Sequence, residues 1–416
     1  MERLQSALGL LVLLGLAWLF SEARRKVRLR PVVAGVVLQL ALGLLFIRAP
    51  GSRAFFLLLN RLVIVLEDAT RAGTSFVFGF LGGDPLPYEE ITPGASYVLA
   101  CRGLPLLLLV SALTALLFHW GVLQRVVGLF SFILRKTLGI SGCESLGVSA
   151  NIFVGMIEAP LFIRLYFAGL TRSELFTIMS GGMATIAGTM MVLYANLLGG
   201  VIDGVLGHLL VASIISAPAA VTVAKLMIPE TGTPREGDFN IRPESRSSMD
   251  AITRGTLQGL ELLLNIVAML IVFVALVFLV NAGLGLLPHW GGEPVSMERL
   301  LGWLMAPLAW LMGVDWSEAR VAGSLMGTKV VLNEMLAYIQ MANLPEGALS
   351  PRSRLIMIYA MCGFANFGSV GIMIGGMGAI SPERRGEVVD LGLRSIVAGT
   401  LATMMTGCVV GMLGLF

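Results

Sequence analysis

Long apolar runs alternate with short charged loops from one end of the chain to the other. A run of about twenty residues with few charges is the length that an α-helix needs to cross a bilayer. No alternation with a period of two residues accompanies these runs, which disfavours a β-barrel. The sequence predicts eight transmembrane helices, at 4–20, 31–48, 96–120, 174–198, 201–228, 256–281, 355–380 and 388–415. The predicted fold class is therefore an all-α polytopic membrane protein.

Two further apolar segments are interrupted by charge. The segment 145–170 contains Glu158, and the segment 322–342 contains Lys329 and Glu334. Irregular backbone at membrane depth is tolerated only where protein surrounds it or where it lines a cavity. We therefore expect both segments to be re-entrant hairpins, which enter the membrane and turn back inside the protein.

Composition supports a membrane class and argues against an enzyme. Of the 416 residues, 56% are hydrophobic and 13% are charged, against about 25% charged in an average soluble domain. The 50 glycines favour close helix packing and broken helices. The four cysteines and three histidines lack metal-ligand spacing. No serine has a histidine nearby and no phosphate-binding loop occurs, so we expect no catalytic activity.

The distribution of cations predicts the orientation. If both termini lie outside, 18 Lys and Arg fall in inside loops and ten fall outside, as the positive-inside rule requires. The chain is then a multi-pass protein of the cell inner membrane with periplasmic termini. The segment 52–80 is too charged to span and is expected to lie at the outer interface. The polar stretch 229–250 is predicted to be a flexible linker. No basic tract interleaved with aromatics points to nucleic acid.

A short internal repeat predicts the architecture. Residues 182–188 match residues 363–369 in a register that pairs Thr185 with Asn366, and each stretch follows one of the acidic hairpins. The predicted topology inverts one copy relative to the other, and inverted repeats with broken helices are typical of secondary transporters. We expect four regions: N-terminal scaffold and interfacial helices at 1–140, a first transport repeat at 141–228, a linker with a scaffold helix and an outer segment at 229–321, and a second transport repeat at 322–416.

The two hairpin acids are the leading candidates for a functional site. A carboxylate at membrane depth costs at least about 2.5 kcal/mol and is functional by default. The alternative for Glu334 is a structural ion pair with Lys329. Asn366 and Ser369 are three residues apart, on one face of a helix. Together with an acid and an aromatic ring they resemble a polyol site.

A second group of polar residues could bind a cation. Asn151 and Thr185 stand near backbone that we expect to be unwound, where their oxygens could serve a small hard ion. The alternative for Thr185 is a hydroxyl bonded back within its own helix.

Four stretches carry a family resemblance. They are Asn-Ile-Phe-Val-Gly at 151–155 followed by Glu158, Gly-Gly-Met-Ala-Thr-Ile-Ala-Gly at 181–188, Met-Gly-Thr-Lys-Val-Val-Leu-Asn-Glu at 326–334, and Cys-Gly-Phe-Ala-Asn at 362–366. With them the chain resembles the concentrative nucleoside transporter family over most of its length. The resemblance implies a homotrimer in membrane lipid, in which a mobile domain imports nucleosides by an elevator movement coupled to sodium or protons.

The resemblance also assigns roles to residues. Ribose binding carries over to Glu334, Asn366 and Ser369, with Phe364 close by. Contact with the nucleoside carries over to the first hairpin tip and to one residue of the following helix; these are Gly155, Met156, Ile157, Glu158 and Met190. The family usually has a Gln-Thr pair before the first hairpin acid to read the base, and here the pair is Met-Ile. Loss of two hydrogen-bonding groups should weaken base recognition.

The same resemblance assigns a sodium site to Asn151, Val154, Thr185 and Ile186. Proton coupling through Glu158 or Glu334 is the alternative. Two other functions stay open: a carrier of another ribosyl or polyhydroxylated solute, and a non-transporting membrane receptor on the same scaffold.

Overall fold

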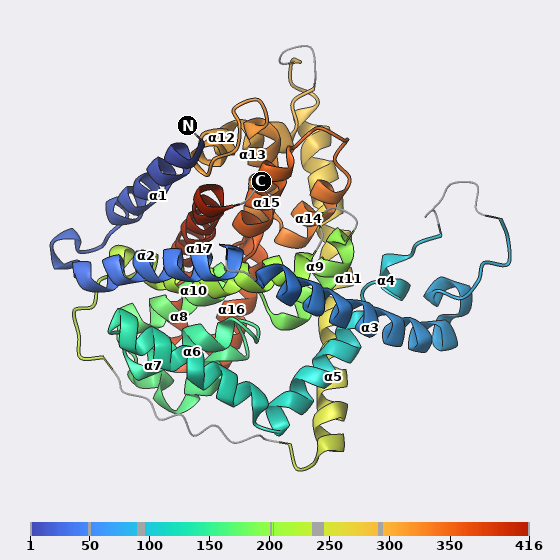
Figure 1. Ribbon diagram of the computed structural model, residues 1–416, viewed down its shortest axis with the longest axis horizontal. Helices are drawn as coiled ribbons and strands as arrows, with labels where there is room; N and C mark the ends of the chain where they lie inside the picture. Colours follow the sequence, from blue (N-terminus) through green and yellow to red (C-terminus); the bar gives the residue numbers. More distant parts are fainter. Residues whose placement is uncertain are drawn as a thin grey trace.

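Figure 1 shows a bundle of helices joined by turns. The computed structural model describes residues 2–48, 51–89, 96–199, 202, 204–234, 245–289 and 294–414, and contains no strand in these ranges. The all-α class is thus confirmed for the described chain. Most of the linker predicted at 229–250 lies outside the described residues.

The N-terminal third supplies the helices that surround the core. They are α1 (Glu2–Leu19), the 3-10 turn η1 (Arg24–Lys26), α2 (Leu29–Gly43) continued by a π turn η2 (Leu44–Arg48), α3 (Ser52–Phe78), the 3-10 turn η3 (Gly79–Gly82), α4 (Leu99–Arg102), α5 (Leu106–His119) and α6 (Val122–Leu138). A helix therefore occupies the segment expected at the outer interface; its position relative to a bilayer remains a prediction.

The next part of the chain forms a hairpin, a broken helix and a long helix. Its elements are α7 (Gly142–Asn151), the 3-10 helix η4 (Ala159–Gly169), α8 (Arg172–Ala184), α9 (Gly188–Leu198) and α10 (Val205–Met227). α7 packs against η4, so the two halves of this segment lie against each other, and its re-entrant position in a membrane remains a prediction.

The last part repeats this order. After α11 (Ser248–Leu284) and α12 (Met297–Leu311) come α13 (Ala319–Val331), α14 (Glu334–Ala342), α15 (Pro351–Met361), α16 (Phe367–Ile380), the 3-10 turn η5 (Pro382–Arg384) and α17 (Arg385–Leu413). Two short helices, then a broken helix, then a long helix reproduce the first set. The internal repeat is therefore visible in the succession of elements, whereas its inversion across a membrane remains a prediction.

Six helical segments of the described chain are long and apolar enough to cross a bilayer, judged by length and composition. They are Leu29–Arg48, Leu99–His119, Arg172–Leu198, Val205–Met227, Ser248–Leu284 and Pro382–Leu413. The other two predicted spans correspond to α1 and to the pair α15 and α16, which are shorter helices. Within the described residues each predicted span thus coincides with one helix or with two consecutive helices, and the total of eight crossings stays a proposal.

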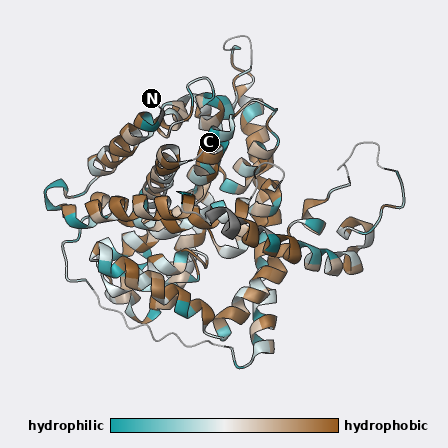
Figure 2. Ribbon diagram, in the orientation of Figure 1, coloured by the Kyte–Doolittle hydropathy of each residue, from teal (hydrophilic) through white to brown (hydrophobic). Residues whose placement is uncertain are grey.

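The long helices of the two repeats cross at the centre. α10 packs against α2, α8 and α17, and α17 packs against α1, α8 and α15. Side chains of α10 and of the C-terminal half of α17 are almost all buried. By contrast, an 18-residue window of α11 has no buried residue, and Figure 2 shows hydrophobic residues along its length. In a membrane protein such an outer surface faces lipid or another subunit.

Close approach of backbones explains two of the glycines. A Cβ on Gly323 would lie 2.7 Å from the backbone nitrogen of Ala306, and one on Gly302 would lie 3.0 Å from the carbonyl oxygen of Arg320. Both distances are shorter than the contacts that a carbon atom makes with backbone nitrogen or oxygen in unstrained packing. These two positions let α12 and α13 lie against each other and so position the second hairpin.

A buried polar cluster fixes the start of α7 and α8. Ser141 and Glu144 form a capping box on α7, and Thr171 and Glu174 form another on α8. The Ser141 hydroxyl also donates to Glu174 at 2.6 Å. Lys225, near the end of α10, pairs with the buried carboxylate of Glu144. Because the Ser141–Glu174 bond joins the two caps and Lys225 pairs with the first of them, these three helix ends are held together.

Candidate functional site

The buried carboxylate of Glu334 lies where the two repeats meet. Glu334 is the first residue of α14, directly after its N-cap Asn333, and is 3% exposed. Its Oε1 accepts a hydrogen bond from the Tyr194 hydroxyl at 2.6 Å, and its Oε2 accepts one from Asn366 Nδ2 at 3.1 Å. A buried carboxylate needs such partners, and here they come from α9 and from the start of α16.

Asn366 connects this carboxylate to α16. It is the N-cap of that helix, and its Oδ1 accepts from the Ser369 backbone N–H at 2.7 Å. Ser369 is 5% exposed, and Phe364 packs partly buried beside the core. The structure thus brings together Glu334, Asn366 and Ser369, the residues predicted to bind ribose, and Phe364 precedes Asn366 by two residues in sequence.

Lys329 does not neutralise this acid by a direct ion pair. Its side chain is fully buried, and Nζ donates to Thr403 Oγ1 at 3.4 Å. In the described chain no carboxylate oxygen lies within 4.0 Å of that ammonium group. The structural alternative for Glu334, a close pair with Lys329, is therefore not what the structure contains.

A second polar site lies at the break between α8 and α9. Asn151 is the last residue of α7, and its Nδ2 donates to the Gly147 carbonyl at 3.1 Å. Its Oδ1 is buried without a hydrogen-bond partner. Thr185, in the break, donates through Oγ1 to the carbonyl oxygens of Asn151 at 2.8 Å and Gly181 at 2.9 Å. The bond to Gly181 is the back-bonded alternative, and it occurs together with the contact to Asn151.

The oxygens at this break fit a small hard cation. Val154 and Ile186 are both buried. In the ranges that the structure covers, no backbone N–H donates to either of their carbonyl oxygens. An amide oxygen without a partner, a hydroxyl oxygen and free carbonyls form a neutral donor set, which suits an alkali ion rather than a transition metal. The four residues predicted for sodium are thus compatible with it.

The tip of the first hairpin divides into a buried and an exposed part. Met156 is 6% exposed, and its Cβ lies close to Gly182 of α8. Ile157 is 40% exposed and borders Gly376 of α16. Of the two apolar residues at the base-reading positions, only Ile157 therefore offers a side chain at the surface.

Glu158 remains apart from the buried acid. The Glu158 side chain is exposed. Its carboxylate lies against Gly155, so closely that a Cβ at Gly155 would collide with the carboxylate oxygen. No hydrogen bond in the described chain joins it to Glu334 or Asn366. The structure therefore groups the residues predicted to bind ribose with one another, whereas the first hairpin acid contacts the backbone of its own tip at Gly155.

Backbone contacts hold the two breaks in place, and one of them joins Thr185, predicted to bind the cation, to Phe364, predicted to lie near the ribose. The N–H of Phe364 donates to the Thr185 carbonyl at 3.3 Å, and the N–H of Gly188 donates to the Phe153 carbonyl at 3.0 Å. The two breaks of the repeats therefore touch at Thr185 and Phe364. Met190, 7% exposed on α9, is four residues before Tyr194 and hence on the same helix face.

The structure corrects the register of the repeat. The sequence match pairs Thr185 with Asn366, but Thr185 directly follows the first half of its broken helix, whereas Asn366 caps the second half of the other. The break in the second repeat is longer, with residues 362–366 between its helices against 185–187 in the first. Thr185 and Asn366 therefore occupy non-equivalent positions, because the two breaks differ in length. Thr185 follows the first helix of its pair, whereas Asn366 precedes the second helix of its own.

Tyr194 is the site residue that sequence reasoning missed. It is fully buried and its ring lies 5.1 Å from that of Tyr338. A tyrosine within an apolar helix needs a partner for its hydroxyl, and a spacing of four residues from Met190 puts it on the face already assigned to substrate. These two signals were present in the sequence.

Together the fold and the site define a helical membrane transporter with internal repeats. Comparison with known proteins identifies its family. Models of the Na+ dependent nucleoside transporter N-terminus and C-terminus match residues 8–81 and 208–411, and a nucleoside recognition (Gate) model matches residues 101–201. The chain belongs to the concentrative nucleoside transporter family.

Relatives match along nearly the whole chain. An uncharacterized transporter YutK of Bacillus subtilis is 40% identical over 99% of this chain and 100% of its own. The putative nucleoside permease NupX of Escherichia coli is 35% identical over 99% of both chains. The nucleoside permease NupC of Helicobacter pylori is 34% identical over 98% of this chain and 97% of its own.

Solved structures agree with the fold. CNTnw in an inward-facing substrate-bound state superposes with a TM-score of 0.91 at 36% identity, covering 99% of this chain and 98% of that one. Variants of CNTnw in an outward-facing and an intermediate state superpose with TM-scores of 0.91 and 0.90. Transporter relatives of this kind are not enzymes.

Proposed function

We propose that this protein imports nucleosides in symport with sodium across the cell inner membrane. The observation that carries the proposal is the buried Glu334 carboxylate, held between Tyr194 and Asn366. A carboxylate fixed in this way accepts hydrogen bonds from the adjacent hydroxyls of a ribose, while the Asn366 amide beside it donates and accepts. Family membership supplies the substrate class.

Sodium is the proposed coupling ion because of the orphaned Asn151 oxygen. A buried oxygen without a partner costs free energy unless a ligand satisfies it, and sodium at Asn151, Val154, Thr185 and Ile186 would do so. The backbone contact between Thr185 and Phe364 then links cation and ribose residues. Reciprocal coupling follows if each ligand stabilises the arrangement that the other needs.

Movement and assembly follow from the family. We propose eight transmembrane helices, two re-entrant hairpins and an elevator movement of a transport domain formed by residues 141–228 and 322–416, within a homotrimer. The close packing of α10 and α17 against both broken helices supports one rigid moving unit. The exposed apolar surface of α11 supports contact with lipid or with a neighbouring subunit.

The apolar hairpin tip shapes the proposed specificity. With Met156 buried and Ile157 exposed, the tip offers packing rather than hydrogen bonds to a base. Recognition would then rest on the ribose. This favours broad acceptance of nucleosides, and a carrier of another ribosyl solute is the second candidate.

The test is uptake of labelled uridine and adenosine into proteoliposomes under an imposed sodium gradient or an imposed proton gradient. We expect accumulation with sodium, reduced to background by Glu334→Gln, which keeps the shape of the side chain but removes its charge. The matched control is Glu346→Gln, an exposed acid after α14, which should leave uptake unchanged.

Other outcomes separate the alternatives. Accumulation under protons alone would transfer coupling to Glu158 or Glu334. Binding of nucleoside without accumulation under either gradient would favour the receptor. Normal uptake by Glu334→Gln would overturn the ribose assignment.

A further inference from the structure

A dense cluster of cations lies on the turn between α1 and α2. Arg24, Arg25, Lys26, Arg28 and Arg30, hereafter the cationic turn, are all exposed. Figure 1 shows this turn at the left edge of the molecule, away from α14, which begins at Glu334. Arg24, Arg25 and Lys26 line an open hollow together with residues 21–23, and the transport proposal gives no residue of the turn a role.

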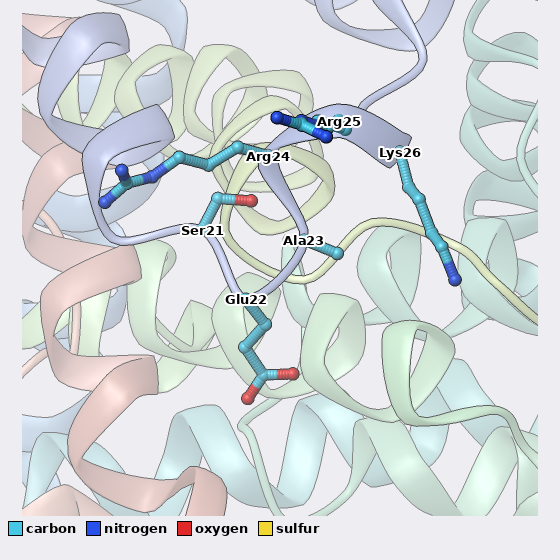
Figure 3. Close-up of a pocket in the computed structure, with 6 residues that line it drawn as sticks. All are labelled: Ser21, Glu22, Ala23, Arg24, Arg25 and Lys26. Atoms are coloured by element: carbon cyan, nitrogen blue, oxygen red, sulfur yellow. The ribbon is translucent and has the colours of Figure 1, made fainter.

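The acid that could neutralise the cationic turn is engaged elsewhere. Glu22 is the only acidic residue in 21–30. Its carboxylate accepts from Arg172 of α8 at 2.9 Å and pairs with Arg394 of α17 at 2.7 Å. Figure 3 shows Glu22 pointing away from Arg25, toward the body of the protein. The positive charge of the turn is therefore left uncompensated by its own acid.

One member of the turn is fixed to the end of α1. The guanidinium of Arg24 donates to the Leu19 carbonyl at 2.7 Å and lies 5.5 Å from the ring centroid of Trp18. Cation–π contact of this kind holds an arginine near an interfacial aromatic ring. The turn therefore has a defined geometry at its first residue.

Apolar side chains on both sides set the depth of the turn in a membrane. Trp18 and Phe20, at the end of α1, are 47% and 53% exposed, and Leu29 and Val33, at the start of α2, are 70% and 58% exposed. Residues so apolar and so exposed at the ends of two neighbouring helices belong in lipid. The cations between them then lie within a few residues of the acyl region, at the level of lipid headgroups.

We propose that the cationic turn binds the headgroups of anionic phospholipids. Clusters of four to eight Lys and Arg next to a membrane helix attract anionic lipid. The arrangement here adds two features that a bare charge count lacks: apolar anchors on both sides, and an acid turned away to Arg172 and Arg394. Glu22 thereby fastens the lipid-binding turn to α8 and α17.

The experiment compares two double variants with the same loss of charge. Arg25→Gln with Arg28→Gln removes two cations of the turn, and Arg125→Gln with Arg164→Gln removes two exposed cations outside it. Binding of phosphatidylglycerol, of phosphatidylcholine and of inorganic phosphate to the purified full chain is measured by native mass spectrometry. We expect the unmodified protein to bind phosphatidylglycerol more tightly than the other two ligands. Its affinity for this lipid should fall at least about tenfold in the turn variant and stay within about twofold in the control variant.

Three results would overturn the proposal. They are equal binding of the two lipids, equal loss in both double variants, and displacement of phosphatidylglycerol by phosphate alone, which would indicate a general anion site. If the turn variant does not purify in folded form, the proposal is tested by the salt dependence of lipid binding to the unmodified protein. Its binding of phosphatidylglycerol must weaken between about 50 and about 300 mM salt, because exposed charges are screened over that range.

Discussion

The hydroxyl of Tyr194 donates to the carboxylate of Glu334 at 2.6 Å, joining residues 140 positions apart in the sequence. One comes from the broken helix of the first repeat and the other from the hairpin of the second. This bond fixes the orientation of the proposed ribose acceptor before substrate arrives. Preorganisation of this kind lowers the cost of binding.

Tyr194→Phe should therefore weaken nucleoside binding. Loss of a hydrogen bond to a charged group costs about 1.5–3 kcal/mol, or roughly ten- to a hundredfold in affinity. The measurement is titration calorimetry with uridine on folded protein. Tyr338→Phe is the matched control, since its hydroxyl donates to the Ile358 carbonyl instead. Equal loss in both variants would show that packing, not the bond to Glu334, matters.

Thr185→Val should impair the response to sodium. The substitution keeps the shape of the side chain but removes the oxygen proposed as a ligand. We expect the sodium concentration that gives half-maximal substrate binding to rise at least about tenfold. This rise corresponds to a loss of roughly 1.4 kcal/mol in the free energy of sodium binding. Thr222→Val, which removes a buried hydroxyl bonded to the Pro218 carbonyl, should leave it unchanged. An unaltered sodium response in Thr185→Val would remove the proposed site.

Ile157→Thr should improve recognition of pyrimidine nucleosides. Ile157 is 40% exposed, so a hydroxyl there can reach substrate or water without being buried unpaired. We expect affinity for uridine to rise a few-fold, and more in the double variant with Met156→Gln if the amide finds a partner. Competition binding measures this, with adenosine as reference. No gain for any nucleoside would indicate a pocket shaped for another solute.

Glu22→Gln should remove a pH-dependent part of the stability. The hydrogen bond from Arg172 holds the pKa of the Glu22 carboxyl below its usual value. A carboxyl whose pKa is lower in the folded than in the unfolded state stabilises the folded protein at pH values above its unfolded pKa of about 4.3. This stabilisation disappears as the pH falls through the lower pKa of the folded state. The variant should be less stable than the unmodified protein near neutral pH, by under about 1 kcal/mol for so exposed a pair.

Thermal unfolding of the purified protein across acid pH measures this effect. The difference between the unmodified protein and Glu22→Gln should vanish in acid below the folded pKa and shrink in high salt. Glu346→Gln is the control and should show neither trend. A difference of the same size at neutral and at low pH would mean that the charge pairs with Arg172 and Arg394 contribute nothing.

Gly363→Ala should destabilise the protein. A Cβ at this position would lie 2.7 Å from Thr403 and 2.8 Å from the Met183 carbonyl oxygen, and that backbone cannot yield cheaply. Overpacking costs about 1–3 kcal/mol. Gly371→Ala, with open space around it on α16, should be neutral or slightly stabilising. The comparison is made by thermal unfolding, and equal midpoints would contradict the close crossing of the two breaks.

Much of the fold was predictable because the bilayer restricts the possibilities. Apolar runs of fixed length must be mostly helical when no water can satisfy the backbone, so in the described chain each predicted span coincides with one helix or with two consecutive helices. Polar residues inside those runs stood out for the same reason, which is why Glu334, Asn366 and Asn151 were predicted. The capping boxes at Ser141 and Thr171 were also readable as local patterns.

Other features were not predictable, since they depend on contacts between distant segments. The sequence left open, as the alternative to a functional role, that Lys329 pairs with Glu334, because the two are near each other along the chain. The structure gives that acid to Tyr194 and Asn366 and turns the lysine toward Thr403. A register based on seven similar residues likewise failed, because the two breaks differ in length.

The sequence by itself determined the class of the protein, the helical spans and the residues that carry unusual chemistry, because each follows from local hydropathy and from the cost of polarity in lipid. Only the tertiary structure decided which of these residues meet. It united Glu334 with Tyr194, left Asn151 Oδ1 without a partner and turned Glu22 away from the cationic turn. Hydrogen bonds between repeats require a precise crossing of helices, and that crossing is set by packing at positions such as Gly363, which no local pattern reveals.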